Sequence, residues 1–318
     1  MAQLTPRFPD TMETPLPIRR DGRVLLFGEV LADIFPSHRV LGGAPFNVAR
    51  HLKAFGRNPV LLSRIGDDEI GREILATMAR NGMTVSGIQL DNHHPTGRVK
   101  VHFDQNGHRF EILPCQAYDF IHPAVARMIR LPLNPALVYF GTLAQRHEVS
   151  ARALKTLLRS TRAPKFLDIN LRAPWFDEKI LRSSLKYADI VKLNSEELAL
   201  LAQMLSLPSG EPQHQADALM QQFDLQQVVV TCGADGAWQM NQNGKVFEVG
   251  NSHPGISVVD TVGAGDGFAA VYILGALRNW SMATTLVRAN DFAAAICGIR
   301  GAIPNHDDFY QPFRLEWK

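Results

Sequence analysis

The sequence has only three cysteines, Cys115, Cys232 and Cys297, which lie far apart and form no Cys-x-x-Cys pair. Neither a disulfide framework nor a thiolate zinc site is therefore indicated, and we expect a reducing cytoplasm as the environment. No apolar run approaches the ~20 residues that a membrane helix needs. Residues 1–20 contain several prolines and no apolar block, so we expect no secretory signal.

An excess of charge of one sign is also missing. The chain has 33 Lys and Arg against 31 Asp and Glu, which gives a formal net charge of +2. This near-balance argues against a dedicated nucleic-acid surface, and we expect no nucleic-acid partner and no membrane partner. The pattern Gly-x-x-x-x-Gly-Lys-Ser/Thr does not occur, which excludes a Walker-type nucleotide site. Hydrophobic residues make up 46% of the 318, enough for a large core.

Short apolar runs alternate with segments of helical periodicity along most of the chain. The runs predict buried strands at 24–27, 60–62, 137–140, 166–169, 190–193 and 228–230. Helices are predicted over 44–55 and 69–81, where Gly56 and Gly82 follow the last periodic residue. Such alternation indicates βαβ units and a mostly parallel sheet. Ligands then bind beyond the carboxyl ends of the strands.

One region breaks this alternation. Val99, Val101 and Phe103 alternate with polar residues, Asn106-Gly107 follows, and 109–112 continue as a second short strand. This pattern predicts a hairpin with one polar face. Because it has no helical crossover, we expect it to lie outside the main sheet. A meander within a single domain is the alternative.

The octet at 260–267, Asp-Thr-Val-Gly-Ala-Gly-Asp-Gly, carries the clearest chemical signal. We expect a buried strand over 256–259 before it and a helix over 268–274 after it. Small residues at 263–265 then lie where the first amides of a helix have no internal partner, which suits an anion such as phosphate. In that setting Asp266 can accept a proton from a hydroxyl that attacks the phosphate. The alternative is a tight turn with Asp266 as an ordinary acid of the first helical turn.

Three further segments complete a pattern. Residues 42–49 read Gly-Gly-Ala-Pro-Phe-Asn-Val-Ala, 194–197 read Asn-Ser-Glu-Glu, and 231–236 read Thr-Cys-Gly-Ala-Asp-Gly. With the octet, and in this order, they resemble the ribokinase-like carbohydrate kinases, also called the phosphofructokinase-B family. The resemblance runs from about Val24 to about Pro304. The segment at 42–49 is most similar to the fructokinase branch.

The resemblance implies a ribokinase-like three-layer α/β/α fold with a mostly parallel central sheet and a small β lid. It implies an irregular tail over 1–22 and a kinase domain over 23–310, with lid segments near 33–42 and 96–118. The implied reaction transfers the γ-phosphate of ATP to a sugar hydroxyl, with fructose as the first choice, and a homodimer through the lid is implied as well. A 2-keto-3-deoxygluconate kinase or another sugar kinase of the family is the alternative. A catalytically silent sugar- or nucleotide-binding regulator is the alternative outside enzymes.

The resemblance also assigns roles to individual residues. Catalysis falls to Asp266 with Gly263, Ala264 and Gly265. The sugar would contact Asp33, Gly42, Gly43, Asn47, Asn170 and Arg172. ATP would contact Asn194, Thr231, Gly233, Gly236 and Asn290. Mg²⁺ would be reached through water from Glu197, and K⁺ would lie at Asp260 and the carbonyl of Val262.

Several of these residues have an ordinary structural alternative. Asn194 can cap a helix with Glu197 in its first turn. Arg172 can serve a structural ion pair, and Asn290 can be a polar residue on a packed helix. The sequence departs from the family pattern at two places. At the first, Ile169 stands where a proline is usual. Residues 114–119, Pro-Cys-Gln-Ala-Tyr-Asp, replace the Arg and the Ala-Asp pair typical of bacterial fructokinases, so the sugar stays open, and Arg172 is available to an acidic one.

Overall fold

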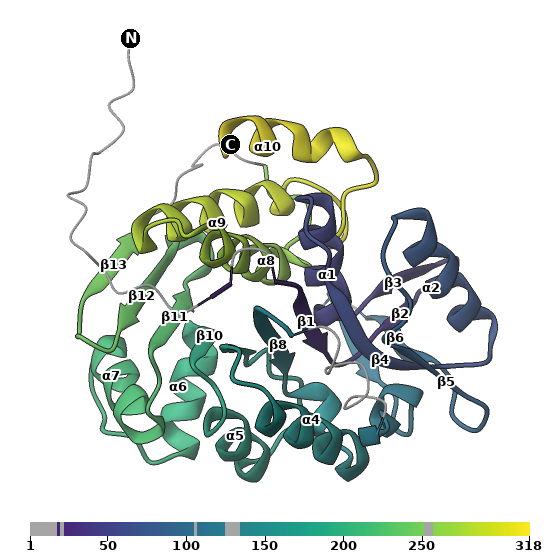
Figure 1. Ribbon diagram of the computed structural model, residues 1–318, viewed down its shortest axis with the longest axis horizontal. Helices are drawn as coiled ribbons and strands as arrows, with labels where there is room; N and C mark the ends of the chain where they lie inside the picture. The colour runs from purple at the N-terminus through teal and green to yellow at the C-terminus, as the bar shows by residue number, and fades with distance from the viewer. Residues whose placement is uncertain (1–17, 20–21, 105–106, 125–133, 251–256) are drawn as a thin grey trace.

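The computed structural model describes residues 18–19, 22–104, 107–124, 134–250 and 257–318. A large sheet forms the middle layer, helices cover both of its faces, and a small sheet projects from one end (Figure 1). The tail predicted over 1–22 falls almost entirely outside the described residues, as does Asn106 of the predicted hairpin turn.

The large sheet has nine strands in the order β13-β12-β11-β10-β9-β8-β1-β4-β5. Neighbours run parallel from β11 to β5, and only β12 and β13 are antiparallel. The bounds are β1 Val24–Phe27, β4 Val60–Gly66, β5 Ile88–Asp91, β8 Leu137–Gly141, β9 Lys165–Asp168, β10 Ile190–Asn194, β11 Gln227–Thr231, β12 Ala237–Asn241 and β13 Val246–Val249. The predicted strands at the six apolar runs are all present.

Both faces of this sheet are buried, which explains why its strands read as continuous apolar runs. In β1, Val24 and Leu26 point into one hydrophobic core, and Leu25 and Phe27 point into the other. All four side chains are at most 1% exposed. A sheet of this kind needs a helical layer on each side.

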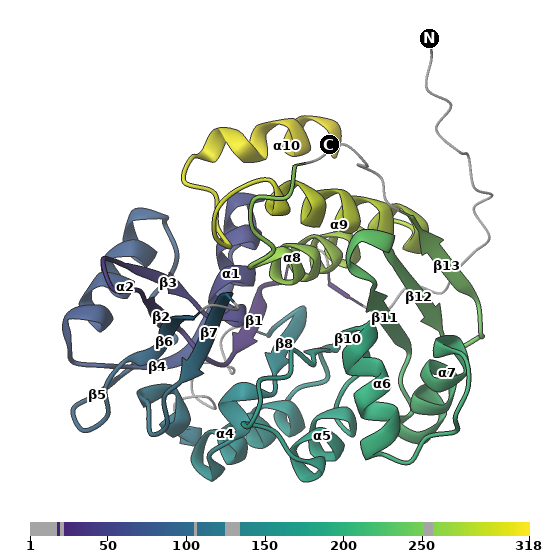
Figure 2. The same cartoon turned by 180° about the vertical axis from the view of Figure 1, so that it is seen from behind.

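The two helical layers are clear when Figures 1 and 2 are compared. One face is covered by α1 Ala44–Ala54, α8 Ala264–Arg278 and α9 Met282–Cys297, with α10 Gln311–Glu316 outside them. The other face is covered by α4 Glu148–Ser160, α5 Glu178–Leu185, α6 Ser195–Met204 and α7 Pro212–Phe223. Helix α2, Glu69–Arg80, lies beside the small sheet. None of the helices in the described part of the chain is long and apolar enough to cross a membrane.

The small sheet has the order β3-β2-β6-β7. Its strands are β2 Leu31–Ile34, β3 Arg39–Gly42, β6 Gly97–Asp104 and β7 Gly107–Ile112. The antiparallel pair β6–β7 is the predicted hairpin, and the prediction that it lies outside the main sheet is confirmed. Because β2 begins directly after β1, the small sheet stands next to the carboxyl end of the central strand.

The strand predicted over 256–259 is wrong for the residues that are described. Residues 257–260 have no regular secondary structure, and Val258 and Val259 are 64% and 56% exposed. Instead of pairing in the sheet, the amides of Val259 and Asp260 donate to the carbonyl of Cys297 at the end of α9. The backbone of this segment is thus held at the end of α9, while the side chains of Val258 and Val259 remain exposed.

An aromatic cluster fixes the C-terminal segment to the layer of α1, α8 and α9. The ring of Phe292 lies at the centre, with centroids of Phe55, His51 and Phe313 at 5.1–5.2 Å in edge-on geometry. Trp317 stacks on Phe55 at 5.5 Å. The cluster ties the chain end to α1, whose first turn borders the candidate site.

Replacing Phe292 by Ala should lower the free energy of unfolding by about 3–5 kcal/mol, because the side chain is fully buried and the cavity cannot fill. Denaturant unfolding measures the loss. The matched control is Phe110→Ala on β7, where the ring is 51% exposed and the expected change is within about 0.5 kcal/mol. Equal losses in the two variants would contradict the described role of the cluster.

Candidate active site

The candidate site lies at the carboxyl ends of the parallel strands. Glu29 follows β1, Arg172 follows β9, and Asn194 ends β10, so three strands of the parallel part of the sheet deliver polar side chains to one edge. The first turn of α8 faces the same edge and brings Asp266 there. The expectation that ligand-binding residues gather beyond these strand ends agrees with this arrangement.

The turn before α8 depends on Gly263. It caps the helix with φ of 81°, a left-handed conformation that favours glycine. A Cβ at this position would also collide with Ala302. The amide of Gly267 makes the first intrahelical bond, to the carbonyl of Gly263, at 2.8 Å. The amide of Ala264 donates to the carbonyl of Thr261 at 3.3 Å, and the amides of Gly265 and Asp266 form the free N-terminal end of a 15-residue helix, which favours an anion.

Asp266 lies beside this end of the helix and is held from the other side of the site. The amide nitrogen of Asn47, in the first turns of α1, donates to its Oδ2 at 2.8 Å. Protein encloses the carboxyl group and raises its pKa, and the negative charge of Asp168 adds to the rise. The bond from Asn47 and the charges of Lys192 and Arg172 oppose that rise. The residue keeps partial exposure, so a substrate can reach it.

Asn47 presents a second polar atom to the site. Its amide oxygen is buried and has no hydrogen-bond partner in the described part of the chain. A buried acceptor of this kind costs about 1–3 kcal/mol if it stays unpaired. A hydroxyl-bearing ligand beside Asn47 would provide the missing donor.

A buried ion pair lies under the turn. Lys192 in β10 donates to Asp168 in β9 at 2.9 Å, and the hydroxyl of Tyr139 in β8 donates to the other oxygen of Asp168 at 3.1 Å. A Cβ built on Gly265 would lie 3.3 Å from the Nζ of Lys192, so the ammonium group reaches the helix start. The site therefore contains a fixed cation next to the free amides.

The segment Gly42-Gly43 closes the site opposite α8. Gly43 has φ of 106°, and a Cβ there would lie 2.7 Å from the carbonyl oxygen of Glu29. A Cβ on Gly42 would contact Asp33 at 3.4 Å. The side chain of Glu29 accepts from the amide of Ala44 at 3.3 Å. Bare backbone and two carboxyl groups thus meet where the sugar is expected.

These two carboxyl groups have raised pKa values. Burial raises the pKa of Glu29 to about 7 and that of Asp33 to about 6, and the nearby charge of Arg172 opposes both shifts. The same charge also acts on Asp266. The charge of Arg172, a residue predicted from the sequence pattern, therefore acts on all three carboxyl groups, while its Nη1 donates to the carbonyl of Leu171 at 3.0 Å. Asn170, two residues earlier, adopts a positive φ of 42° in the turn that leads to it.

Asn194 and Glu197 form a capping box at the start of α6. The side chain of Asn194 accepts from the amide of Glu197 at 2.8 Å, and Glu197 accepts from the amide of Asn194 at 2.9 Å. The other oxygen of Glu197 accepts from the amide of Leu171 at 2.7 Å, which fixes the loop that carries Arg172. The helix-cap alternative is thus present, and burial raises the pKa of Glu197.

The loop 231–236 follows β11 and reaches the end of β13. A Cβ on Gly236 would collide with the carbonyl of Val249, which explains the glycine. Asn290 in α9 donates to the carbonyl of Gly250 at 3.3 Å. A cavity of about 340 Å³ adjoins the loop, and its lining includes Glu211, Pro212, Gln213, Cys232, Asp235, Ala237, Trp238, Glu248, Val249 and Gly250. Its carboxyl groups disfavour phosphates, which leaves the α8 side of the loop for an anion.

Asp260 is fixed by two amides. Its Oδ1 accepts from Val262 at 3.0 Å and its Oδ2 from Gly301 at 2.9 Å. In the part of the chain that is described, no group of three or more His, Cys, Asp or Glu side chains could hold a metal ion.

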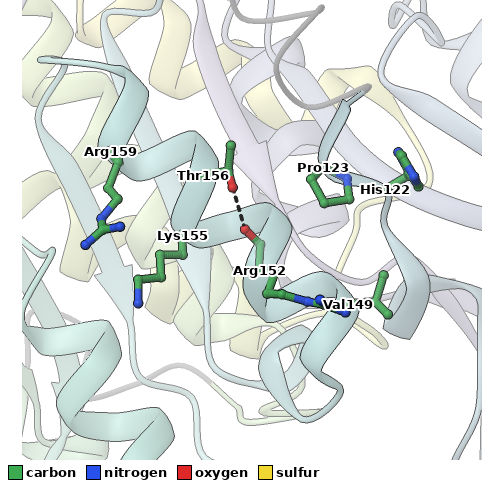
Figure 3. Close-up of a pocket in the computed structure, with 7 residues that line it drawn as sticks. All are labelled: His122, Pro123, Val149, Arg152, Lys155, Thr156 and Arg159. Atoms are coloured by element: carbon green, nitrogen blue, oxygen red, sulfur yellow. Dashed lines mark hydrogen bonds between the residues drawn. The ribbon is translucent and has the colours of Figure 1, made fainter.

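A separate groove lies along α4, on the opposite helical layer (Figure 3). It measures about 700 Å³, and its described lining consists of His122, Pro123, Val149, Arg152, Lys155, Thr156 and Arg159. None of these residues belongs to the candidate site, which is confined to the strand ends and the start of α8.

Sequence reasoning missed three polar residues of the site, Glu29, Asp168 and Lys192. Each is at most 6% exposed. A signal was present for two of them, because Asp168 and Lys192 interrupt apolar strands that must be buried on both faces. Charges in such strands need partners, and here each is the other's partner.

Comparison with known proteins agrees with these observations. Residues 19–308 match the model of the pfkB family of carbohydrate kinases. A fructokinase of Klebsiella pneumoniae is 30% identical over 294 residues, covering 87% of this chain and 92% of that protein. A fructokinase-2 of Oryza sativa subsp. japonica is 27% identical over 312 residues, covering 88% and 90%. The chain belongs to the pfkB family of carbohydrate kinases.

Solved structures agree on the fold. A fructokinase of Xylella fastidiosa with bound ATP superimposes with a TM-score of 0.78 at 21% identity, covering 94% of this chain and 100% of that one. A fructokinase of Vibrio cholerae O395 with fructose, ADP and a calcium ion bound gives 0.75 at 23%, covering 92% and 99%. The predicted family and the predicted ribokinase-like α/β fold with a second, small sheet are confirmed.

Because the pKa of Glu29 is raised, replacing this residue should change how the free energy of unfolding depends on pH. Between pH 4.5 and about 7 the folded protein keeps a proton on Glu29 that the unfolded chain releases, so rising pH destabilises the fold. A shift of this size is worth about 3 kcal/mol. Glu29→Gln retains the acceptor for Ala44 and removes the titration. The variant should therefore gain stability relative to wild type across this interval.

Denaturant unfolding of both proteins at pH 4.5 and pH 8 measures that gain. Glu148→Gln, at a side chain that is 77% exposed, is the control and should follow the wild type at both pH values. A difference between Glu29→Gln and wild type that stays constant with pH would contradict the raised pKa.

Proposed function

We propose that the protein transfers the γ-phosphate of ATP to a hydroxyl group of fructose. One observation carries this proposal: Asp266 lies at the free N-terminal amides of α8 and accepts a 2.8 Å hydrogen bond from Asn47, a residue of the opposite wall. A base, an anion-binding helix end and a hydroxyl-binding amide thus meet at one place. These are the parts that phosphoryl transfer to an alcohol requires.

In the proposed reaction, the sugar hydroxyl oxygen attacks the γ-phosphorus and forms a new P–O bond. The bond between that phosphorus and the bridging oxygen of the β-phosphate breaks, and ADP leaves. The hydroxyl proton passes to the carboxylate of Asp266. A raised pKa makes this carboxylate a stronger base than an ordinary aspartate, which favours the transfer near neutral pH.

Charge on the transferring group would be stabilised from two sides. The amides of Gly265 and Asp266 would donate to its oxygens along the axis of α8. Lys192 would add a positive charge, because its ammonium group reaches Gly265 while it remains paired with Asp168. The carboxylate of Asp168 holds the lysine in place, so the charge is positioned before substrate arrives.

A neutral sugar fits the charge of the site better than an acidic one. The charge of Arg172, the cation expected to recognise an acid, already acts on Glu29, Asp33 and Asp266. A further carboxylate would compete for a charge that three groups share. Asp33 and the free amide oxygen of Asn47 can instead accept from hydroxyl groups beside Gly42 and Gly43. The fructokinases among the relatives support fructose as this sugar.

The nucleotide is proposed to lie between the loop 231–236 and α8, with Thr231, Gly233, Gly236, Asn194 and Asn290 around it. Mg²⁺ would screen the phosphate charge, and Glu197 could contact the ion through a water molecule. Each oxygen of Glu197 uses one lone pair for a backbone amide and keeps another. Mg²⁺ retains several waters in such sites. A potassium ion would be held by Asp260 and the carbonyl of Val262.

The domain organisation is proposed along the same lines. The kinase domain would span 23–310 after a tail over 1–22, and the small sheet would act as a lid through segments near 33–42 and 96–118. Its position directly after β1 supports this role. Asp33 lies in β2 and Gly42 lies in β3, so movement of these strands would move both residues relative to the bound sugar. A homodimer would form through the lid.

Replacing Asp266 by Asn tests the proposed base. Asparagine has nearly the same size as aspartate and can keep the hydrogen bond with Asn47, but it cannot act as a base. The turnover rate should fall by ~10²–10⁴ while the Michaelis constants for ATP and fructose change little. A coupled assay of ADP release measures this. Asp308→Asn, at an exposed acid, should behave as wild type. A folded Asp266→Asn protein with most of the wild-type turnover would contradict the mechanism.

A sugar panel tests the substrate. Wild-type protein with ATP should phosphorylate fructose faster than 2-keto-3-deoxygluconate, because Arg172 is shared by three carboxyl groups. Rapid turnover of 2-keto-3-deoxygluconate with no detectable fructose phosphate would show that the acid, and not fructose, is the substrate. In that case Arg172→Ala should raise the Michaelis constant for the acid strongly, and a small change would remove Arg172 from substrate recognition.

A further inference from the structure

One buried guanidinium group joins the lid to the loop that carries Arg172. Arg146 lies between β8 and α4, and its side chain is only 5% exposed. Its Nε and Nη2 donate to the two oxygens of Asp119 at 2.7 and 2.8 Å, and Asp119 is 2% exposed. Such a two-pronged pair is among the strongest side-chain contacts a protein can form.

The first group of contacts lies on the chain as it leaves the lid. Nη2 of Arg146 also donates to the carbonyl of Leu113, the residue directly after β7, at 2.7 Å. Between Leu113 and Asp119 lies Tyr118, whose ring is 5.0 Å below the guanidinium carbon. A Cβ on Gly97, the first residue of β6, would lie 2.8 Å from the same ring. Arg146 therefore contacts the chain directly after β7, and the Tyr118 ring beneath it lies against the start of β6.

The second contact lies on the substrate side. The guanidinium carbon of Arg146 is 4.4 Å from the ring centre of Trp175, at the distance of a cation–π contact. The amide of Trp175 donates to the carbonyl of Arg172 at 2.7 Å. Movement of Arg146 would thus be passed to the loop that carries Arg172.

This cluster is not arranged for stability alone. The hydroxyl of Tyr118 and the Nη1 of Arg146 are both buried, and the charge of Arg146 and a side-chain hydrogen bond from it act on that hydroxyl. Well-packed apolar residues often replace a buried ion pair with no loss of stability. A planar cation that spans three chain segments does something that apolar packing would not do, because it fixes their relative positions.

We propose that Arg146 is a positioning residue that fixes the lid exit relative to the Arg172 loop and thereby sets the affinity for the sugar. This inference rests on the proposed function, since it assumes that the sugar binds between Asp33 and Arg172. Arg146 contacts neither the start of α8 nor Asp266 in any hydrogen bond of the described chain. Its loss should therefore weaken sugar binding and leave phosphoryl transfer from bound substrates nearly unchanged.

Arg146→Lys is the main test. Lysine keeps the positive charge and loses the planar fork, so it cannot hold Asp119, Leu113 and Trp175 together. The Michaelis constant for the sugar that wild type phosphorylates fastest should rise ~10-fold, a change of about 1.4 kcal/mol. kcat should stay within about twofold, and the Michaelis constant for ATP should not change. Arg182→Lys, at an exposed pair with Glu178 on α5, is the matched control.

Trp175 provides a second test that keeps the buried ion pair intact. Trp175→Ala should reproduce the rise in the Michaelis constant, and Trp175→Phe should recover most of the wild-type value because a ring still stacks on Arg146. If Arg146→Lys does not fold, this pair of variants decides the matter. Unchanged sugar affinity in folded Trp175→Ala overturns the proposal, as does a loss of kcat equal to the rise in the Michaelis constant.

Sugar binding can also be measured separately from turnover. The chain has four tryptophans, and fructose should change the fluorescence of Trp175, which Trp175→Phe removes from the signal. In Arg146→Lys, the concentration of fructose needed for the change should rise ~10-fold. A wild type that turns over no sugar would refute the proposed function. Equal fructose affinity in wild type and Arg146→Lys would refute only the role of Arg146.

Discussion

The hydrogen bond from Asn47 to Asp266 is the contact on which the site depends. It spans 2.8 Å between residues that are 219 positions apart in the chain, and it joins the first turns of α1 and α8. Both turns require glycine just before the helix, Gly43 at φ of 106° and Gly263 at φ of 81°. Because the two helices belong to one layer over the same sheet, their N-terminal ends face one another across the strand ends. The packing of that layer therefore defines the place where the proposed reaction would bring sugar and phosphate together.

This arrangement brings more carboxyl groups than cations to the site. Glu29, Asp33, Asp168 and Asp266 crowd one edge of the sheet, and burial raises the pKa of Glu29, Asp33 and Asp266. Two cations oppose the surplus in different ways. Lys192 is buried and paired with Asp168, while Arg172 lies on an exposed loop and acts on the other three. The fixed cation suits a transferring phosphate, and the exposed one can adapt to the sugar. The same loop is held by Glu197 on one side and by Trp175 on the other.

Much of the fold could be predicted from the sequence. The six apolar runs are strands of the central sheet, because burial on both faces leaves a continuous apolar pattern. Helices at 44–54 and 69–80 agree with their periodicity, and the alternating residues around 99–112 form the hairpin of the second sheet. The strand predicted over 256–259 is wrong because the apolar residues Val258 and Val259 lie exposed in a segment whose backbone bonds to the end of α9. Periodicity over four residues cannot separate a buried strand from such a segment.

The site could be predicted only in part. The motifs pointed to Asp266, Asn47 and Arg172, which the fold brings to one edge of the sheet, since each lies near the boundary of an element and within a recognisable motif. Lys192 and Asp168 were missed because a charge within a strand becomes meaningful only when its neighbour strand is known. Arg146 was missed for the same reason, since Asp119 and Trp175 approach it only in the folded chain. Contacts between distant segments are set by tertiary packing, which a local pattern does not contain.

The most direct measurement of the central claim is a crystal structure with fructose and a non-hydrolysable ATP analogue bound. The account predicts that a fructose hydroxyl lies about 2.6–3.2 Å from the carboxylate of Asp266, the reach of a general base. The γ-phosphate should lie on the amides at the start of α8. A structure in which Asp266 keeps only Asn47 as its partner, with every fructose hydroxyl beyond hydrogen-bond distance, would contradict it.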